Sequence, residues 1–375
     1  MDLTFNDRQK ILKSTAHEFF AKECPLSAVG DAEQSDLGFS RTLWRRMADL
    51  GWLGLTYPER YGGGGASFLD LYVIYEEMGR FLVPAPHLAT VILVGETLLK
   101  AGSQEQKLAY LQQIARGERI ATAAVAEPSG TPGPEGVQLS ARRKGDGFVL
   151  NGTKLLVPYA QAASDILCLA RTGGSGAEGV SLFLVDRAAA GVSLEPLPNI
   201  AGEKLFAVTL RDVTVPQDRL VGPAGSGWPA FESVLSRASV LTCGMVVGCA
   251  EHVLEMTTEY AKQRVQSGRP IGQFQAVQNM CVDIAADTQL TRLLARQAAW
   301  ALDQGLPSQR EVATARAFAS RAVQRVTRLA HDVHAGVGFM LQHPLPMYTR
   351  RAKHWELALG DPRYHHEQMA EALSL

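Results

Sequence analysis

The chain has 375 residues, with 37 basic and 38 acidic side chains and a formal net charge of −1. Because neither sign is in excess, we expect neither nucleic acid nor an anionic membrane surface as a partner. Hydrophobic residues make up 46% and charged residues 20%, which is typical of a globular protein with a substantial core.

The cysteines give no sign of a disulfide framework or a zinc site. There are five of them, an odd number, and no two are spaced as a CxxC pair. We therefore expect reduced thiols and a cytoplasmic location. The N-terminus lacks the basic-then-apolar order of a signal peptide. The longest mostly apolar stretch, residues 240–250, is shorter than a bilayer span, so membrane insertion is not expected.

The first 120 residues are predicted to be helical. Leu43, Met47 and Leu50 follow helical i, i+4, i+7 spacing, and residues 70–83 show a similar apolar face. Between these helices, residues 62–65 are four consecutive glycines. They lack the lysine and the preceding strand of a phosphate-binding loop, so we interpret them as an interhelix turn.

Residues 121–220 predict a β domain of short strands. Strand-like runs cover residues 147–154, 166–170, 180–185, 192–194 and 207–210. Asn151-Gly152 is a strong hairpin signal, and Asp146-Gly147 marks a turn before it. From residue 221 the pattern is helical again, with helices expected at 236–264, 274–304, 310–335 and 347–359. The predicted fold class is α+β, with a β domain between two helical units.

Three features of the helical part carry candidate chemistry. His331 and His334 lie one helical turn apart, but no third ligand supports a metal site. Arg264 and Gln275 flank a glycine-proline turn; they could hold a diphosphate, although a capping arginine and an exposed glutamine are the simpler interpretation. Arg237 lies in an apolar helix, so its charge needs a partner or a ligand.

The order of motifs resembles the acyl-CoA dehydrogenase family along essentially the whole chain. The motifs are residues 50–63, Ala126-Glu127-Pro128, residues 147–154, residues 210–216, Tyr260 to Arg264 and residues 272–276. The resemblance implies an N-terminal α-helical domain (1–120), a middle β-barrel-like domain (121–220) and a C-terminal four-helix bundle (221–375). It also implies FAD as cofactor, an acyl-CoA substrate, and a dimer or tetramer.

The family mechanism needs a carboxylate that removes the α proton of the thioester while a hydride leaves to the flavin. The position that matches the usual base is Leu359. Other family members keep the base on the first long bundle helix, at the position of Ser236. Neither residue is a carboxylate. Asp361 and Glu356 are the nearest possible substitutes.

Further departures from the family lie at the implied flavin site. Ala126 replaces a threonine, and Leu156 to Pro158 replace the stretch that packs on the isoalloxazine and hydrogen-bonds to it. A proline offers neither a hydroxyl nor an N–H group. In the glycine-rich segment after His334, Ala335 replaces the first glycine, and Asp332 replaces a glutamine.

Other implied site residues are retained. Arg264 and Gln275 match residues that reach the FAD of a neighbouring subunit, and Gly336 and Gly338 match the family's glycines. Arg237 matches a family arginine, and we assign it to substrate binding. The residues that serve a neighbour's cofactor are therefore kept better than those that serve the chain's own chemistry.

These observations predict a subunit that lacks its own base and completes the FAD site of a base-bearing, acyl-CoA dehydrogenase-like partner chain. The FAD would then be shared with that partner or held weakly by this chain. The substrate would be an acyl-CoA thioester, with bulky sterol-type acyl groups one possibility. Two alternatives stay open. One is a self-sufficient dehydrogenase whose base is Asp361 or Glu356, and the other is a flavin-dependent oxygenase-type relative.

Overall fold

The computed structural model describes residues 3–374. By their internal contacts these residues form two compact units. The first contains the chain up to Val29, the segment from Ser67 to Val83, and everything from Ser239 onward. The second contains the segments from Gly30 to Ala66 and from Pro84 to Ala238.

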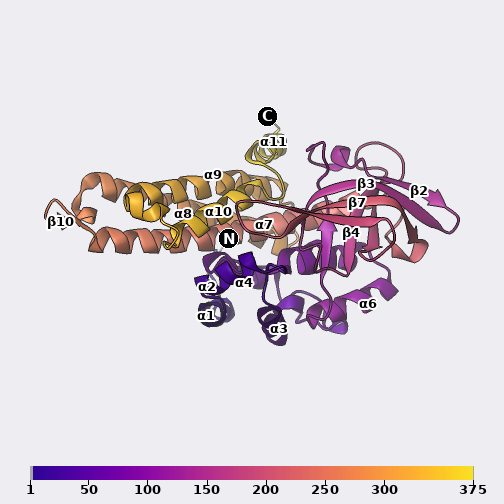
Figure 1. Ribbon diagram of the computed structural model, residues 1–375, viewed down its shortest axis with the longest axis horizontal. Helices are drawn as coiled ribbons and strands as arrows, with labels where there is room; N and C mark the ends of the chain where they lie inside the picture. Colours follow the sequence, from indigo (N-terminus) through magenta and orange to yellow (C-terminus); the bar gives the residue numbers. More distant parts are fainter. Residues whose placement is uncertain (1–2, 375) are drawn as a thin grey trace. The chain divides into compact units, whose positions relative to one another are not determined.

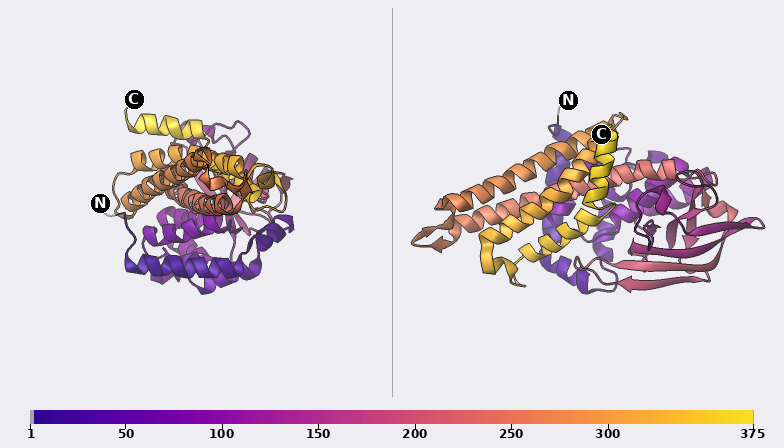
Figure 2. Two further views of the ribbon diagram at one scale, coloured as in Figure 1. Left: turned by 90° about the vertical axis from the view of Figure 1, so that its left-hand side faces the viewer. Right: turned by 90° about the horizontal axis from the view of Figure 1, so that it is seen from above.

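The first unit is helical, and its long helices lie side by side in Figures 1 and 2. Its elements are α1 (Asp7–Glu23), α4 (Phe68–Arg80), most of α7 (Trp228–Gln263), α8 (Gln275–Asp303), α9 (Gln309–His334), α10 (Leu345–Leu357) and α11 (Pro362–Ala372). The short strands β9 (Val265–Gln266) and β10 (Arg269–Pro270) pair at the turn between α7 and α8. The four helices predicted after residue 221 are confirmed, and α11 was not predicted.

Small buried side chains allow close packing in this bundle. Ala315, Ala319 and Ala330 on α9 are at most 1% exposed. At Gly79 of α4, an added Cβ would lie 2.0 Å from the carbonyl oxygen of Met245 on α7, so only glycine permits this approach. Backbone-to-backbone contact of this kind fixes α4 against α7.

Helix α7 is longer than predicted, because it begins at Trp228 and not at residue 236. Its 36 residues make it long and apolar enough to cross a membrane, by length and composition alone. However, 78% of its most apolar stretch is buried inside the protein. A helix that is apolar on all sides is expected at the centre of a large bundle. Its composition is therefore explained by packing.

The second unit contains several short α-helices and one π-helix. They are α3 (Arg41–Asp49), α5 (Thr97–Ala101) and α6 (Gln104–Ala115), together with a π-helix (Leu88–Glu96); α2 (Leu26–Gln34) spans the boundary between the units. Ser40 and Ser103 cap α3 and α6 with their side chains. π-Helices are rare in proteins, and those that occur are often found at functional sites.

The sheet of the second unit has eight strands. They are β1 (Ala121–Ala124), β2 (Ser140–Lys144), β3 (Gly147–Pro158), β4 (Asp165–Arg171), β5 (Val180–Asp186), β6 (Val192–Leu197), β7 (Leu205–Pro216) and β8 (Leu220–Val221). Their order is β6-β7-β3-β2-β4-β5-β8, and β1 pairs with β4. Within residues 3–374 no pairing joins β6 to β8, so the sheet is open where the resemblance implied a barrel-like domain. The α+β fold class is confirmed.

The hairpin predicted at Asn151-Gly152 is wrong. Both residues lie inside β3, and the chain turns earlier, between Lys144 and Gly147, where Gly145 has a φ of 62°. At Gly152 the pairing of β3 with β7 shifts register, which marks a β-bulge. An added Cβ there would lie 2.8 Å from Leu139 Cγ. The glycine therefore serves a close approach within the sheet.

Candidate functional site

Arg237, whose charge was expected to need a partner in its apolar helix, forms an ion pair with Glu96. The guanidinium Nη2 donates to Glu96 Oε1 at 3.0 Å, and Nε donates to Oε2. Glu96 is the last residue of the π-helix, and its side chain is 5% exposed against 21% for Arg237. The Thr56 hydroxyl lies 3.4 Å from Glu96 Oε1. This bidentate pair in the second unit could not be found from sequence spacing.

Ser236, the second implied base position, offers no acid or base chemistry. Its hydroxyl donates to the backbone carbonyl of Glu232, one turn earlier in α7, at 3.2 Å. A neutral hydroxyl engaged with its own helix cannot remove an α proton. Glu232 itself accepts from the indole N–H of Trp228 at 3.2 Å.

Leu359, the first implied base position, lies in the short connection between α10 and α11. Its φ is 61°, in the left-handed region, and Gly360 follows with a φ of 118°. A leucine in this region carries backbone strain of about 1–2 kcal/mol. An apolar side chain therefore stands in a strained backbone where the family has its carboxylate.

The two possible substitutes, Asp361 and Glu356, both have structural contacts. The Asp361 carboxylate accepts from the backbone N–H of Tyr364 at 2.8 Å and so caps α11. The Glu356 carboxylate is paired with Lys353 Nζ at 2.6 Å. Each carboxylate already serves a local purpose in the helices that carry it.

Arg316 of α9 fixes the connection that contains Leu359. Its side chain is fully buried, and Nη2 donates to the carbonyl oxygens of Trp355, at 2.8 Å, and Ala358. These are carbonyls of the last turn of α10, which have no partner inside the helix. Burial lowers the pKa of Arg316 from its ordinary value. The sequence does place this arginine on the alanine-rich buried face of α9, and that position could have identified Arg316 as a functional or structural charge.

Three of the departures from the family at the implied flavin site, at positions 126, 156 and 158, are apolar side chains. Leu156 has a φ of 56° and is 57% exposed, at a second bulge between β3 and β7. The Pro158 carbonyl accepts from Thr122 Oγ1 at 2.6 Å, and the Ala126 carbonyl accepts from the N–H of Leu155 at 2.9 Å. Positions 126, 156 and 158 present no side-chain donor. These residues do not fit the family's way of holding a flavin.

A buried ion pair that the sequence did not reveal joins β3 to the segment after β1. Lys154 Nζ is 2.7 Å from Glu127 Oε1, and the two side chains are 0% and 6% exposed. The carboxylate also accepts from the backbone N–H groups of Gln138 and Leu139 at 3.0–3.1 Å. Glu127, recognised only as part of a motif, therefore ties the end of β1 to β2 and β3.

The glycine-rich segment after α9 contains one tightly packed glycine and one glycine in open space. At Gly338 an added Cβ would lie 2.9 Å from His334 Cβ, whereas at Gly336 nothing lies within 4 Å. Ala335, in place of the first glycine, has φ 51° and ψ −140°. The Asp332 carboxylate faces Arg328 at 3.3 Å. Gly336 thus leaves open space for a ligand, and Gly338 serves internal packing.

The histidines of this segment do not form a metal site. His334 stacks on Tyr260 with ring centroids 4.3 Å apart, and burial lowers its pKa to about 4. His331 Nε2 lies 2.8 Å from the Thr349 hydroxyl. Among residues 3–374 no group of three or more His, Cys, Asp or Glu side chains is arranged to hold a metal ion.

Arg264 and Gln275, the residues implied to reach a neighbour's cofactor, are exposed. Arg264 follows the last residue of α7, and Gln275 begins α8, on either side of the β9–β10 turn. Within the described part of the chain, neither side chain makes a hydrogen bond or an ion pair. A guanidinium and a carboxamide without internal partners are available to a group from outside.

Family models match almost the whole chain in the same order as these motifs. Residues 6–118 match the acyl-CoA dehydrogenase N-terminal domain, 122–213 the middle domain and 225–374 the C-terminal domain. The chain belongs to the acyl-CoA dehydrogenase family. Members of this family are FAD-binding flavoprotein oxidoreductases, so the recognition made from motifs is confirmed.

Individual relatives are distant but cover the full length. The chain is 32% identical over 369 residues to the acyl-CoA dehydrogenase FadE27 of Mycobacterium tuberculosis, covering 96% of this chain and 95% of the relative. It is 28% identical over 372 residues to the acryloyl-CoA reductase (NADH) of Anaerotignum propionicum, covering 97% and 94%.

Solved structures agree on the fold. A chain of the ChsE4–ChsE5 complex of Mycobacterium tuberculosis superposes with a TM-score of 0.91 at 30% identity, covering 100% of this chain and 99% of that one. Butyryl-CoA dehydrogenase of Megasphaera elsdenii gives 0.93 at 25% identity, with both chains fully covered.

Proposed function

We propose that this chain is a subunit of a hetero-oligomeric acyl-CoA dehydrogenase and does not supply the catalytic base. One observation carries the proposal: the two family base positions hold Leu359 and Ser236, and the carboxylates of Asp361 and Glu356 are engaged in a helix cap and an ion pair. A misplaced or occupied carboxylate forfeits most of the benefit of proximity. The base for α,β-dehydrogenation then comes from a partner chain.

The same proposal assigns a cofactor-binding role to the residues that match the family's. Arg264 and Gln275 are exposed and have no partners within residues 3–374, and Gly336 borders open space. We infer that they contact the diphosphate side of an FAD held mainly by the partner. When bound, FAD supplies the hydride acceptor. Arg264 would contribute charge and hydrogen bonds to the phosphates.

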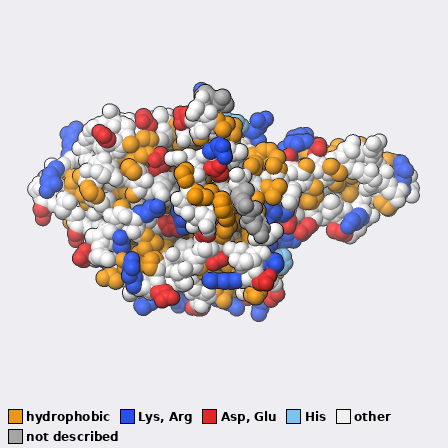
Figure 3. All heavy atoms as spheres, turned by 180° about the vertical axis from the view of Figure 1, so that it is seen from behind, with side chains coloured by type: hydrophobic (Ala, Val, Ile, Leu, Met, Phe, Trp, Pro, Cys, Tyr) orange, Lys and Arg blue, Asp and Glu red, His pale blue; other side chains and the backbone are white. Residues whose placement is uncertain are grey.

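Exposed apolar side chains favour a partner on the helical unit. Val282, Leu290 and Leu293 of α8 are 64%, 43% and 42% exposed, and Phe339 and Leu341, after α9, are 68% and 95% exposed. Figure 3 shows hydrophobic side chains interspersed with charged ones on the face it displays. Exposed apolar side chains such as these are available for a protein–protein contact.

The relatives indicate the kind of assembly and substrate. One similar structure is a complex of two named chains, ChsE4 and ChsE5. Another, with a TM-score of 0.88 at 28% identity and 98% coverage of both chains, is a variant of the Tcur3481–Tcur3483 steroid acyl-CoA dehydrogenase. We infer that the partner is a second acyl-CoA dehydrogenase-like chain and that the acyl group is bulky, with sterol-type groups included.

Co-expression with a base-bearing family member tests the role of Arg264. The complex should contain FAD and oxidise an acyl-CoA, and Arg264→Ala in this chain should lower its FAD content several-fold. Arg269→Ala is the matched control, because this arginine lies on the same turn but stacks on Phe274 at 4.3 Å. An equal FAD content in both variants would show that this chain does not reach the cofactor.

A second set of variants addresses the relocated base. If the lone chain oxidises an acyl-CoA, and Asp361→Asn or Glu356→Gln abolishes that activity, the self-sufficient enzyme is correct and the subunit proposal is wrong. Leu359→Glu in the lone chain should restore little activity, because positions 126, 156 and 158 still lack donors toward a flavin.

A further inference from the structure

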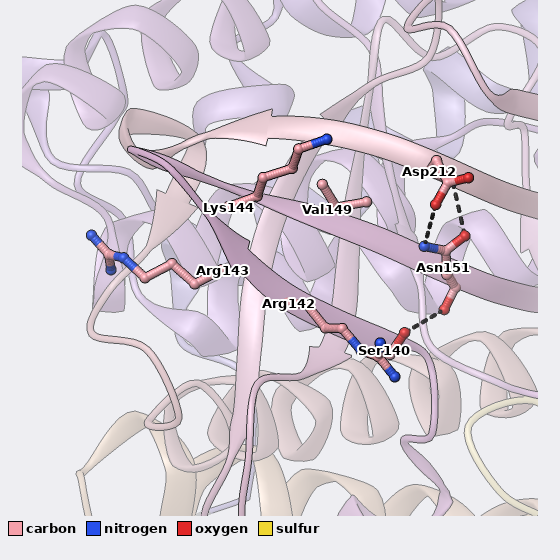
Figure 4. A pocket seen from close by; sticks show the side chains of 7 residues that line it. All are labelled: Ser140, Arg142, Arg143, Lys144, Val149, Asn151 and Asp212. Atoms are coloured by element: carbon pink, nitrogen blue, oxygen red, sulfur yellow. Dashed lines mark hydrogen bonds between the residues drawn. The ribbon is translucent and has the colours of Figure 1, made fainter.

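A basic hollow lies on the sheet of the second unit, outside every site described above. It has a volume of about 530 Å³ and lies over β2, β3 and β7. Figure 4 shows the seven residues that line it: Ser140, Arg142, Arg143, Lys144, Val149, Asn151 and Asp212. A chain with a net charge of −1 thus concentrates three cations in the last three residues of one strand.

The cations divide between the two faces of β2. Side chains alternate along a strand, so Ser140, Arg142 and Lys144 share one face, and Arg143 points to the other. Arg143 lies over the Phe148 ring at 5.7 Å. Arg142 and Lys144 are exposed, and within residues 3–374 neither has a carboxylate partner. Two unpaired positive charges therefore stand on the same surface.

The polar residues of the hollow are hydrogen-bonded to one another, and its one carboxylate already has a partner. Asn151 Nδ2 donates to Asp212 Oδ1 at 3.0 Å, and the N–H of Asp212 donates to Asn151 Oδ1 at 2.8 Å. The Ser140 hydroxyl donates to the Asn151 carbonyl at 3.3 Å. Asp212 has a φ of 51°, a strained conformation that this reciprocal pair helps to hold. The carboxylate is thereby held by Asn151, and no ion pair joins it to Arg142 or Lys144 within the described chain.

The spacing of the cations indicates the form of the ligand. Residues two apart on a strand are separated by about 6.6 Å, and an extended peptide repeats its side chains on one face at the same interval. We propose that this face binds an extended acidic segment of a partner protein, with Asp or Glu at alternate positions opposite Arg142 and Lys144. The hollow is open and has no aromatic lining residue, which disfavours stacked nucleobases.

A labelled peptide of alternating Glu and Ser, titrated with the full chain and followed by fluorescence anisotropy, tests this proposal. The double variant Arg142→Gln with Lys144→Gln should weaken binding roughly tenfold, because it removes both exposed charge contacts to the peptide. The matched control is the double variant Lys262→Gln with Arg310→Gln, which removes two exposed cations that do not line the hollow and should change binding less than about twofold. A peptide with Lys in place of Glu should not bind.

Salt and competitors complete the experiment. Raising the ionic strength from about 0.01 M to about 0.15 M shortens the screening length from about 30 Å to about 8 Å and should weaken binding. The proposal fails if the control double variant, Lys262→Gln with Arg310→Gln, weakens binding as much as Arg142→Gln with Lys144→Gln does. It also fails if single-stranded DNA or phosphatidylserine vesicles displace the peptide at lower concentration than an unlabelled copy of it.

Discussion

Arg237 and Glu96 form a bidentate ion pair that joins α7 to the end of the π-helix. The carboxylate is almost fully buried, and the guanidinium is largely so. The pair therefore sets where this arginine, kept from the family, is held.

Glu96→Leu should destabilise the protein by about 3 kcal/mol, because it leaves a buried guanidinium without its carboxylate. Adding Arg237→Met should recover most of that loss, because two apolar groups replace the whole pair. Urea denaturation of the wild type, the single and the double variant measures both effects. A single variant as stable as the wild type would show that the pair contributes no stability.

Lys154→Met should cost about 2–3 kcal/mol, since Glu127 would keep its backbone donors but lose its buried cation. In the matched double variant, Glu127→Gln with Lys154→Met, the amide oxygen still accepts from those N–H groups and no charge is buried. We expect it to be more stable than Lys154→Met alone. The reverse order would contradict this role for Glu127.

Ala335→Gly should stabilise the protein by about 1 kcal/mol, because φ 51° with ψ −140° is a conformation that only glycine adopts without strain. The neighbouring Gly336→Ala serves as the control. Open space surrounds that position, so an added methyl group should change stability by less than about 0.5 kcal/mol. Thermal denaturation distinguishes these outcomes. An Ala335→Gly variant less stable than the wild type would show that the Ala335 backbone is not strained.

His87 should make the protein acid-sensitive. Burial lowers its pKa to about 4, although its imidazole contacts the Trp52 carbonyl at 3.2 Å. The unfolded chain takes up this proton near pH 6.5, so the contribution of His87 is complete above about pH 6.5. It is lost as the pH falls toward about 4, amounting to roughly 3 kcal/mol.

His87→Gln should remove this part of the pH dependence and keep a donor for the Trp52 carbonyl. The free energy of unfolding, measured by denaturant at several pH values between about 7.5 and about 4.5, should fall less steeply in the variant. Parallel curves for variant and wild type would mean that His87 is not held neutral in the folded protein.

Much of the fold could be predicted from periodicity. The long helices after residue 221 and the strands β4 and β5 lie within two residues of their predicted bounds, since their apolar patterns are regular. The exception is the start of α7, which begins eight residues before the predicted residue 236. Asn151-Gly152 misled because the same dipeptide that favours a turn also suits a bulge, and the choice depends on Leu139 and Asp212, which are distant in sequence.

The sequence could predict those parts of the candidate site that depend on a single residue, but not those that depend on a pair of residues brought together by the fold. That Arg237 needs a partner follows from its apolar helix, but the identity of Glu96 depends on a π-helix that has no recognised sequence signature. The pairing of Lys154 with Glu127 likewise requires the strands to be placed first. Leu359 and Ser236, by contrast, could be identified at the two implied base positions from the sequence alone, because each position depends on a single residue.

The visible absorption spectrum of the chain purified alone, before and after adding an acyl-CoA, tests the central claim most directly. We expect a nearly colourless protein that shows no bleaching, and a yellow complex that bleaches when a base-bearing family member is co-expressed. A lone chain that purifies yellow and is bleached by an acyl-CoA would contradict the account.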